Sequence, residues 1–308
     1  MQNIQNITVY LGSSGRCRDI FKDTAREMGR LIGAHEKNLV YGGMDAGLMG
    51  IVANTALQNG AKVTGIIPKS LKDSERIHPN LSETILVADL WERKKKMFKR
   101  ADAIINLPGG FGTLDEATEA LYWADLGSHA KPIVFINTEN YWDALLNYLR
   151  PLPDYRKEHV LIAQTPEEAF DMLARWLPPE MSGDESYLPH FEEDILQNTD
   201  EPLIFDTASI KQTYILATAL GLKQLGKHDR HIGLLNDNRQ FDAILQWIDR
   251  AKEEHFLTDR CKMLFDTATD EKTLRQKMDK QKMVRLNLHT EKWGPSETST
   301  HIEIKETK

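Results

Sequence analysis

The chain has 308 residues, which is longer than a typical single domain, and its 41% hydrophobic and 28% charged residues are usual for a folded globular protein. Disordered and fibrous proteins are excluded by this composition. A formal net charge of −7 at pH 7 argues against binding nucleic acid over the whole surface and favours a small-molecule ligand.

Short apolar runs recur along the first part of the chain, with helical segments between them. They lie at residues 7–11, 38–41, 62–67, 84–88, 102–107, 132–137 and 160–163. Several are apolar without alternation, as expected for parallel strands that helices cover on both faces. The predicted fold class is therefore α/β, a doubly wound (Rossmann-like) parallel sheet with helices on both faces.

This pattern ends near Pro178, in a stretch that contains Pro, Gly and Ser and leads into the acidic segment 191–194. We predict a nucleotide-binding domain over residues 1–180 and an acidic linker over 181–201. Residues 289–308 are polar and are predicted to form a tail.

An internal repeat links the first domain to the segment 202–288, which we call the half-repeat. Residues of the first domain recur 99 positions later without a gap: Leu126, Gly127, His129, Ile133, Asn137, Asp143, Ala144 and Leu146 match Leu225, Gly226, His228, Ile232, Asn236, Asp242, Ala243 and Leu245. The same offset places Ala208–Gln212 on the glycine-rich stretch 109–113, and Ile215 on Glu116. The half-repeat is thus predicted to be a degenerate α/β half-domain, either packing material or a regulatory element.

Three glycine-rich turns each follow a predicted strand, at residues 12–15, 42–50 and 108–113. In a doubly wound sheet such turns gather at the carboxyl ends of the strands, where ligands bind. Glycine lets the backbone approach an anion, and the amides at the next helix N-terminus are donors for phosphate. Three such turns favour a phosphate-bearing ligand over tight turns that bind nothing.

A basic helix is predicted over residues 92–100, directly before the strand that ends at Pro108. Most of its charges are expected to face solvent, but Arg93 could clamp a phosphate or ribose with its planar fork of donors. After the third turn, Thr113 and Glu116 have the spacing of a capping box, in which the carboxylate satisfies a backbone amide. A catalytic carboxylate is the alternative for Glu116.

The motif Pro108-Gly-Gly-Phe-Gly-Thr-Leu-Asp-Glu116, with Glu92-Arg-Lys94 and the stretch Tyr41 to Gly50, resembles the LONELY GUY (LOG) family. The resemblance covers about residues 4 to 176. It implies a phosphoribohydrolase that releases the base from a nucleoside 5′-monophosphate, of the AMP or cytokinin riboside type, and leaves ribose 5-phosphate. The same signature has been labelled lysine decarboxylase, but nothing in the sequence would hold pyridoxal phosphate.

By match to the family, Arg93 and Glu116 are the catalytic pair. The resemblance also implies these substrate-binding residues: Gly12, Ser13, Gly42, Gly43, Lys94, Met97, Pro108, Gly109, Gly110, Gly112 and Thr113. Neither a cofactor nor a metal is expected. The chain departs from the family pattern at Leu90-Trp91 and at Met44, which predicts an altered base pocket.

A relative of the family carries molybdenum cofactor, so a non-catalytic carrier is the main alternative, and a nucleotide sensor covered by the half-repeat is a third. The resemblance implies a homodimer. If the half-repeat takes the partner's place, a monomer is expected instead.

Two cysteines, Cys17 and Cys261, are too few for a disulfide framework or a zinc site, which fits a reducing cytoplasm. The N-terminus lacks a basic region followed by an apolar stretch, and no run approaches the length of a membrane span. We therefore expect a cytoplasmic protein that neither binds membranes nor is exported.

Overall fold

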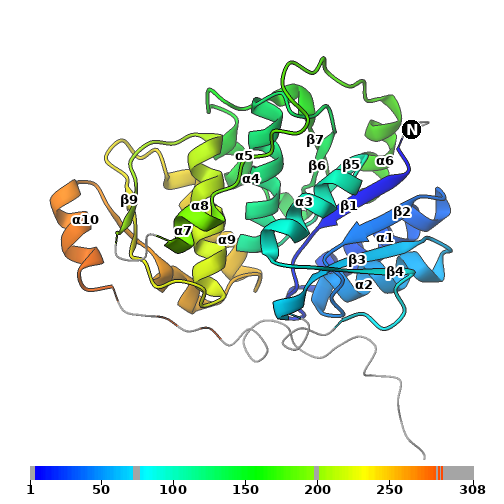
Figure 1. The fold of residues 1–308 in the computed structure, drawn as a ribbon, viewed down its shortest axis with the longest axis horizontal. Helices are drawn as coiled ribbons and strands as arrows, with labels where there is room; N and C mark the ends of the chain where they lie inside the picture. The colour runs from blue at the N-terminus through cyan, green and yellow to red at the C-terminus, as the bar shows by residue number, and fades with distance from the viewer. Residues whose placement is uncertain (1–3, 72–76, 198–200, 282–283, 285, 287–308) are drawn as a thin grey trace, which may run out of the picture.

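The computed structural model describes residues 4–71, 77–197, 201–281, 284 and 286. The predicted polar tail lies outside these residues. The first part of the chain forms a parallel sheet in the order β4-β3-β2-β1-β5-β6-β7 (Figure 1). Its strands are β1 (Asn6–Tyr10), β2 (Asn38–Tyr41), β3 (Val63–Pro68), β4 (Glu83–Val87), β5 (Ala103–Asn106), β6 (Ile133–Ile136) and β7 (Val160–Ala163). All the apolar runs predicted as strands are strands of this sheet.

Helices flank the sheet on both faces, which confirms the doubly wound fold. They are α1 (Asp19–Ala34), α2 (Gly47–Gln58), α3 (Leu90–Arg100), α4 (Phe111–Asp125), α5 (Asp143–Leu149) and α6 (Pro166–Arg175), with the 3-10 turns η1 (Lys69–Leu71), η2 (Thr138–Asn140) and η3 (Lys157–His159). Helix α1 packs against both α2 and α6. It does so because Phe21, Ala25, Met28 and Ile32 recur every three or four residues and are all buried.

The direction of winding reverses between β1 and β5, which are neighbours in the sheet. From β1 the chain moves outward through β2, β3 and β4, and from β5 it moves the opposite way through β6 and β7. The loops that leave β1 and β5 therefore diverge and leave a crevice at the carboxyl edge of the sheet.

The half-repeat forms a second parallel sheet in the order β10-β9-β8. Its strands are β8 (Leu203–Phe205), β9 (Ile232–Leu235) and β10 (Asp266–Ala268), and its helices are α8 (Ile210–Gln224), α9 (Asp242–Glu253) and α10 (Glu271–Met278), with the turn η4 (Asp259–Leu264). Helices α4 and α8 begin and end 99 residues apart, and so do β6 and β9. The sequence offset therefore relates matching elements of structure.

Local hydrogen bonds also recur at this offset. His129 Nε2 lies 2.9 Å from the carbonyl oxygen of Ala120, and His228 Nε2 lies 2.9 Å from that of Ala219. The amide of Asn137 donates to Asp143 at 2.8 Å, and the matching pair 99 residues later is joined at 2.7 Å. These contacts support the interpretation that the half-repeat duplicates the last β-α-β portion of the first domain.

The two copies pack against each other across a pseudo-twofold axis. Helix α4 lies on α8, and α5 lies on α9. The ring of Trp142 stacks on Trp247 at 5.9 Å between centroids, and Tyr148 lies 6.3 Å from Phe241. Because 241 and 247 are the counterparts of 142 and 148, each contact becomes the other when the copies are exchanged. This is the pattern of an isologous interface between two identical subunits.

The described part of the predicted acidic linker, residues 181–197, contains the short helix α7 (Glu192–Gln197) and packs against the first domain. The indole nitrogen of Trp123 donates to the Pro189 carbonyl at 2.9 Å, and Ser128 Oγ donates to that of Tyr187 at 2.8 Å. A continuous hydrophobic core runs from the first domain into the half-repeat. The hydrophobic core is therefore continuous across the predicted boundary near residue 180.

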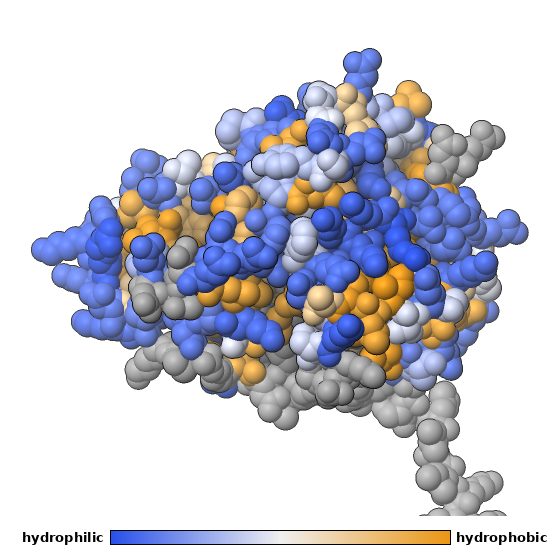
Figure 2. Space-filling model, viewed as in Figure 1, coloured by the Kyte–Doolittle hydropathy of each residue, from blue (hydrophilic) through white to orange (hydrophobic). Residues whose placement is uncertain are grey.

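The face seen in Figure 2 is mainly hydrophilic, with an apolar area near the sheet edge formed by β3 and β4. Leu86 of β4 is among the exposed large apolar residues. In the part of the chain that the structure describes, no helix is both long enough and apolar enough to cross a membrane.

Candidate active site

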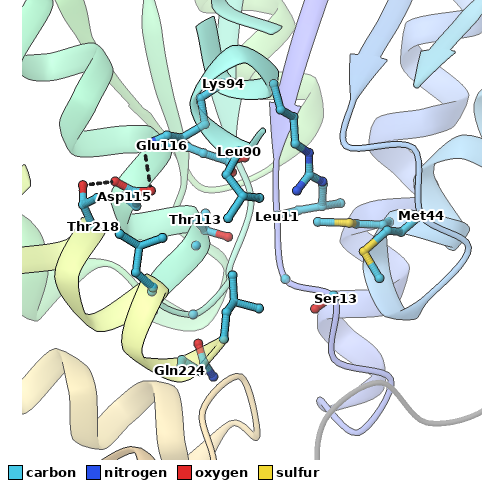
Figure 3. A pocket seen from close by; sticks show the side chains of 18 of the residues that line it. Leu11, Ser13, Met44, Leu90, Lys94, Thr113, Asp115, Glu116, Thr218 and Gln224 are labelled. Carbon is cyan, nitrogen blue, oxygen red and sulfur yellow. Dashed lines mark hydrogen bonds and ion pairs between the residues drawn. The ribbon is translucent and has the colours of Figure 1, made fainter. Parts of the chain in front are cut away.

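A cavity of about 130 Å³ opens in the crevice beside β1 and β5 (Figure 3). The loops after these strands are joined there, because the Gly12 amide donates to the Pro108 carbonyl at 3.1 Å. The lining residues come from the loops after β1, β2 and β5, from α2, α3, α4 and α7, and from the half-repeat: Leu11, Gly12, Ser13, Met44, Met49, Leu90, Arg93, Lys94, Gly110, Gly112, Thr113, Asp115, Glu116, Glu192, Thr218, Gly221, Leu222, Gln224 and Leu225.

The N-terminus of α4 faces this cavity without a side-chain cap. Its cap position is Gly110, which has no side chain to accept from the first-turn amides. Gly110 and Gly112 both line the cavity, and a Cβ at Gly112 would meet nothing within 4 Å. Uncapped amides at the positive end of a helix dipole form an anion site, which suits a phosphate group.

The capping box predicted for Thr113 and Glu116 is wrong. Helix α4 begins at Phe111, so Thr113 already lies within its first turn. Within the described residues, the Glu116 carboxylate makes no hydrogen bond and is left facing the cavity. Glu116 therefore does not cap α4, and the catalytic alternative for this residue is left.

Burial raises the pKa of Glu116 to about 7, because removing the carboxylate from water disfavours its charged form. The positive charges of Arg93 and Lys94 oppose this effect, and the carboxylate of Asp115 adds to it. A carboxyl group whose pKa lies near neutrality can exchange a proton under ordinary conditions, which is the property required of an acid-base catalyst.

Arg93 is positioned by the second glycine-rich turn. Its Nη2 donates to the Gly42 carbonyl at 3.1 Å. A Cβ on Gly42 would lie only 1.8 Å from that same nitrogen, so glycine is needed for the guanidinium to approach. The Nε of Arg93 is buried and has no hydrogen-bond acceptor among the described residues. An unmatched donor in a cavity wall is suited to a polar ligand.

Lys94, next along α3, is buried in a cluster of carboxylates. Its ammonium nitrogen lies 2.9 Å from Asp115, 3.3 Å from Glu119 and 3.2 Å from Glu192. Burial alone would lower the pKa of Lys94, but these negative charges outweigh burial and raise it. Lys94 therefore remains charged and ties together α3, α4 and α7.

Helix α8 completes this cluster from the half-repeat. The Thr218 hydroxyl donates to Asp115 Oδ1 at 2.6 Å, and the Tyr214 hydroxyl donates to Glu119. The two pairs are related by the pseudo-twofold axis, since 214 and 218 are 99 residues beyond 115 and 119. Burial raises the pKa of Glu119 to about 8, and the positive charge of Lys94 opposes this shift.

Comparisons with known proteins agree with these motifs. Residues 49–173 match a family model described as "Possible lysine decarboxylase". A rice protein (Oryza sativa subsp. japonica), named probable cytokinin riboside 5′-monophosphate phosphoribohydrolase LOGL6, is 36% identical over 180 residues, which cover 56% of this chain and 72% of the rice protein. The Arabidopsis thaliana protein with the corresponding name LOG6 is 37% identical over 182 residues, or 56% of this chain and 90% of that protein.

The chain belongs to the LOG family. Among solved structures, the molybdenum cofactor binding protein of Rippkaea orientalis covers 56% of this chain and 98% of its own, with 20% identity and a TM-score of 0.45. That likeness is too weak to say anything about a ligand. The family model ends at residue 173, so the half-repeat lies outside the matched LOG region.

The structure brings most of the predicted LOG site residues to one cavity. Those that line it are Gly12, Ser13, Arg93, Lys94, Gly110, Gly112, Thr113 and Glu116. Met97 does not reach it and is buried in the hydrophobic core. Four others support the walls from behind instead of lining them: Gly42, Gly43, Pro108 and Gly109. A Cβ on Gly109 would lie 2.1 Å from Thr113 Oγ1, so this glycine permits close packing of the loop on α4.

The sequence did not predict the part of the cavity wall that α7 and α8 supply. These residues are Glu192, Thr218, Gly221, Leu222, Gln224 and Leu225. The departures from the LOG pattern at Met44 and Leu90 do line the cavity, whereas Trp91 stacks on His190. The repeat offset was the available signal for α8, because a repeat that packs isologously brings its matching helices together.

Proposed function

We propose that this chain hydrolyses the N-glycosidic bond of a nucleoside 5′-monophosphate to give the free base and ribose 5-phosphate. One observation carries the proposal: the uncapped N-terminus of α4 opens on the same cavity as the Glu116 carboxylate, which no described residue hydrogen-bonds. The two lie about one helical turn apart, ~5 Å along the axis, so one ligand can meet both.

In this arrangement the 5′-phosphate binds at the start of α4. Backbone amides from Phe111 to Thr113 donate to its oxygens, and the helix dipole stabilises the negative charge. Ser13, on the loop after β1, lies on the same cavity wall. Gly112, in the first turn of α4, leaves room for an anion, because a Cβ built there would meet nothing within 4 Å.

The ribose then lies over Glu116. As the bond between C1′ and the base nitrogen breaks, its electron pair leaves with the base and positive charge develops on the sugar. The Glu116 carboxylate stabilises this charge and takes a proton from the water that attacks C1′. The departing base nitrogen gains a proton in the same overall reaction. Arg93, which lines the cavity, holds the sugar or phosphate through its guanidinium donors.

The test is release of base and ribose 5-phosphate from AMP, CMP, GMP, UMP and isopentenyladenosine monophosphate. Glu116→Gln keeps the size of the side chain and removes the charge, so turnover should fall by at least about a hundredfold. Glu193→Gln, on the exposed side of α7, is the matched control and should remain active. Full turnover by Glu116→Gln would refute the assignment, and binding without release by the wild type would favour a carrier or sensor.

We further propose that the chain acts as a monomer, with the half-repeat in the place of a partner subunit. The pseudo-twofold contacts of α4 with α8 and of α5 with α9 already cover the face that a second copy would use. Of the two assembly states that the sequence left open, the packing favours this one. It also explains why the cavity needs α8, since one of its walls comes from the half-repeat.

A further inference from the structure

Helix α8 of the half-repeat lines the cavity, but the amides at its own start are already bonded. At the start of α8 the Ser209 hydroxyl accepts from the Gln212 amide at 3.0 Å. The Asp154 carboxylate accepts from the amides of Ile210 and Lys211 at 2.9 and 3.3 Å. The donors that α4 leaves open are therefore filled in α8. Its role in ligand binding must come from its later turns.

Those later turns contain a glycine that the helix itself does not require. Gly221 lies inside α8, where glycine stabilises a helix less than alanine does. It is not one of the glycines with positive φ, so no unusual backbone conformation explains it. A Cβ built at Gly221 would meet nothing within 4 Å. The space beside it belongs to the cavity, because Gly221 is one of the lining residues.

The repeat shows what stands at the equivalent position of the first copy. The counterpart of Gly221, 99 residues earlier, is Tyr122, a large side chain that is 8% exposed. Its ring lies 6.0 Å from that of Phe191 and 6.1 Å from that of Tyr214. One copy thus fills this position with an aromatic ring, whereas the copy that faces the cavity leaves it empty.

We propose that Gly221 is a specificity-determining residue, and that the space beside it receives the base of the nucleotide. This inference rests on the proposed function, which places the phosphate at the start of α4 and the ribose over Glu116. Apolar side chains are available to the faces of the base: Leu222 of α8 and the Leu225 that follows this helix, together with Met44 and Leu90. Thr218 and Gln224 also line the cavity and can meet the polar edge of the base. A planar heterocycle suits such a slot, because its faces need no hydrogen-bond partner.

The test compares ligands that differ only in the base, in the Glu116→Gln background so that none is consumed. Binding of AMP, CMP and ribose 5-phosphate is measured by calorimetry for Gly221→Ala and Gly221→Leu. A leucine that intrudes on the base should weaken AMP binding by about tenfold or more, with a smaller effect on the smaller base of CMP. Ribose 5-phosphate has no base, so its affinity should not change. Lys211→Ala, at the exposed start of α8, is the control.

Unfolding of the same Gly221 variants is measured to check that each of them folds. Gly221→Ala should raise the urea concentration at the midpoint of unfolding, because alanine favours a helix and the added methyl meets open space. Unchanged AMP binding in a folded Gly221→Leu protein would overturn the inference, and so would an equal loss for AMP and ribose 5-phosphate. If neither ligand binds when Gly221 is intact, the fault lies with the proposed function instead.

Discussion

Replacing Glu116 by glutamine is expected to stabilise the protein above neutral pH while it removes activity. The carboxylate lies in a cavity wall where burial raises its pKa from an ordinary 4.5 to about 7. In the folded protein the group therefore binds its proton more tightly than in the unfolded chain. Protonation of Glu116 contributes stability that is fully present below about pH 4.5 and is lost as the pH rises through about 7.

The size of the effect follows from that difference. The difference between a pKa of 4.5 in the unfolded chain and about 7 in the folded protein corresponds to at most about 3 kcal/mol of unfolding free energy. The Glu116 side chain is not fully shielded from solvent, so screening reduces the energy and we expect about 1 to 3 kcal/mol. Glutamine resembles the protonated acid and avoids this cost at every pH.

The assay is urea unfolding of the wild type and Glu116→Gln at about pH 5 and about pH 8.5. The two proteins should differ little at the lower pH, and the variant should be more stable at the higher one. Glu193→Gln, which is exposed, should follow the wild type at both. If Glu116→Gln gives no advantage at the higher pH, the carboxylate is not held in the environment described here.

Three further predictions follow from the site and its packing. The kcat/KM for nucleotide hydrolysis should rise with pH through about 7 and level off above it, because Glu116 must be ionised to act; a profile that falls over this range would contradict the role. Gly42→Ala should displace the Arg93 guanidinium and lower kcat/KM by about tenfold or more while the protein stays folded, as steady-state kinetics and circular dichroism can show. Light scattering should give the mass of one chain, and a stable dimer through α4 and α5 would refute the substitution of the half-repeat for a partner.

The sheet could be predicted because its signal is local. Each strand is a short apolar run bounded by turn residues, and the glycines that follow β1, β2 and β5 mark the edge where the cavity forms. The capping-box alternative placed the N-cap of α4 at Thr113, three residues too late, because Ser and Thr are the usual cap residues. Here the cap is Gly110, and leaving the helix end uncapped is what makes it an anion site.

Two parts of the site left no local signal. Glu192 lies in an acidic stretch that is typical of solvent-exposed chain, yet its carboxylate pairs with Lys94 in the interior. Glu192 is buried because it pairs with Lys94, which lies almost a hundred residues earlier in the sequence. The residues around Glu192 therefore give no sign of this pairing. The α8 wall also depends on contacts between residues about a hundred positions apart, such as Thr218 with Asp115.

The two copies show how one scaffold can be divided between catalysis and support. Both copies keep the apolar helix faces that make the pseudo-twofold interface, because each copy buries its apolar face against the other. The copies differ where a ligand would bind. In the first copy, the N-terminus of α4 has no side-chain cap and Tyr122 places a ring later in the helix. In the second copy, Asp154 of the first domain accepts from the first amides of α8, and Gly221 leaves open space at the position equivalent to Tyr122. These opposite differences border the same cavity, at the ends that we propose for the phosphate, on α4, and for the base, against α8.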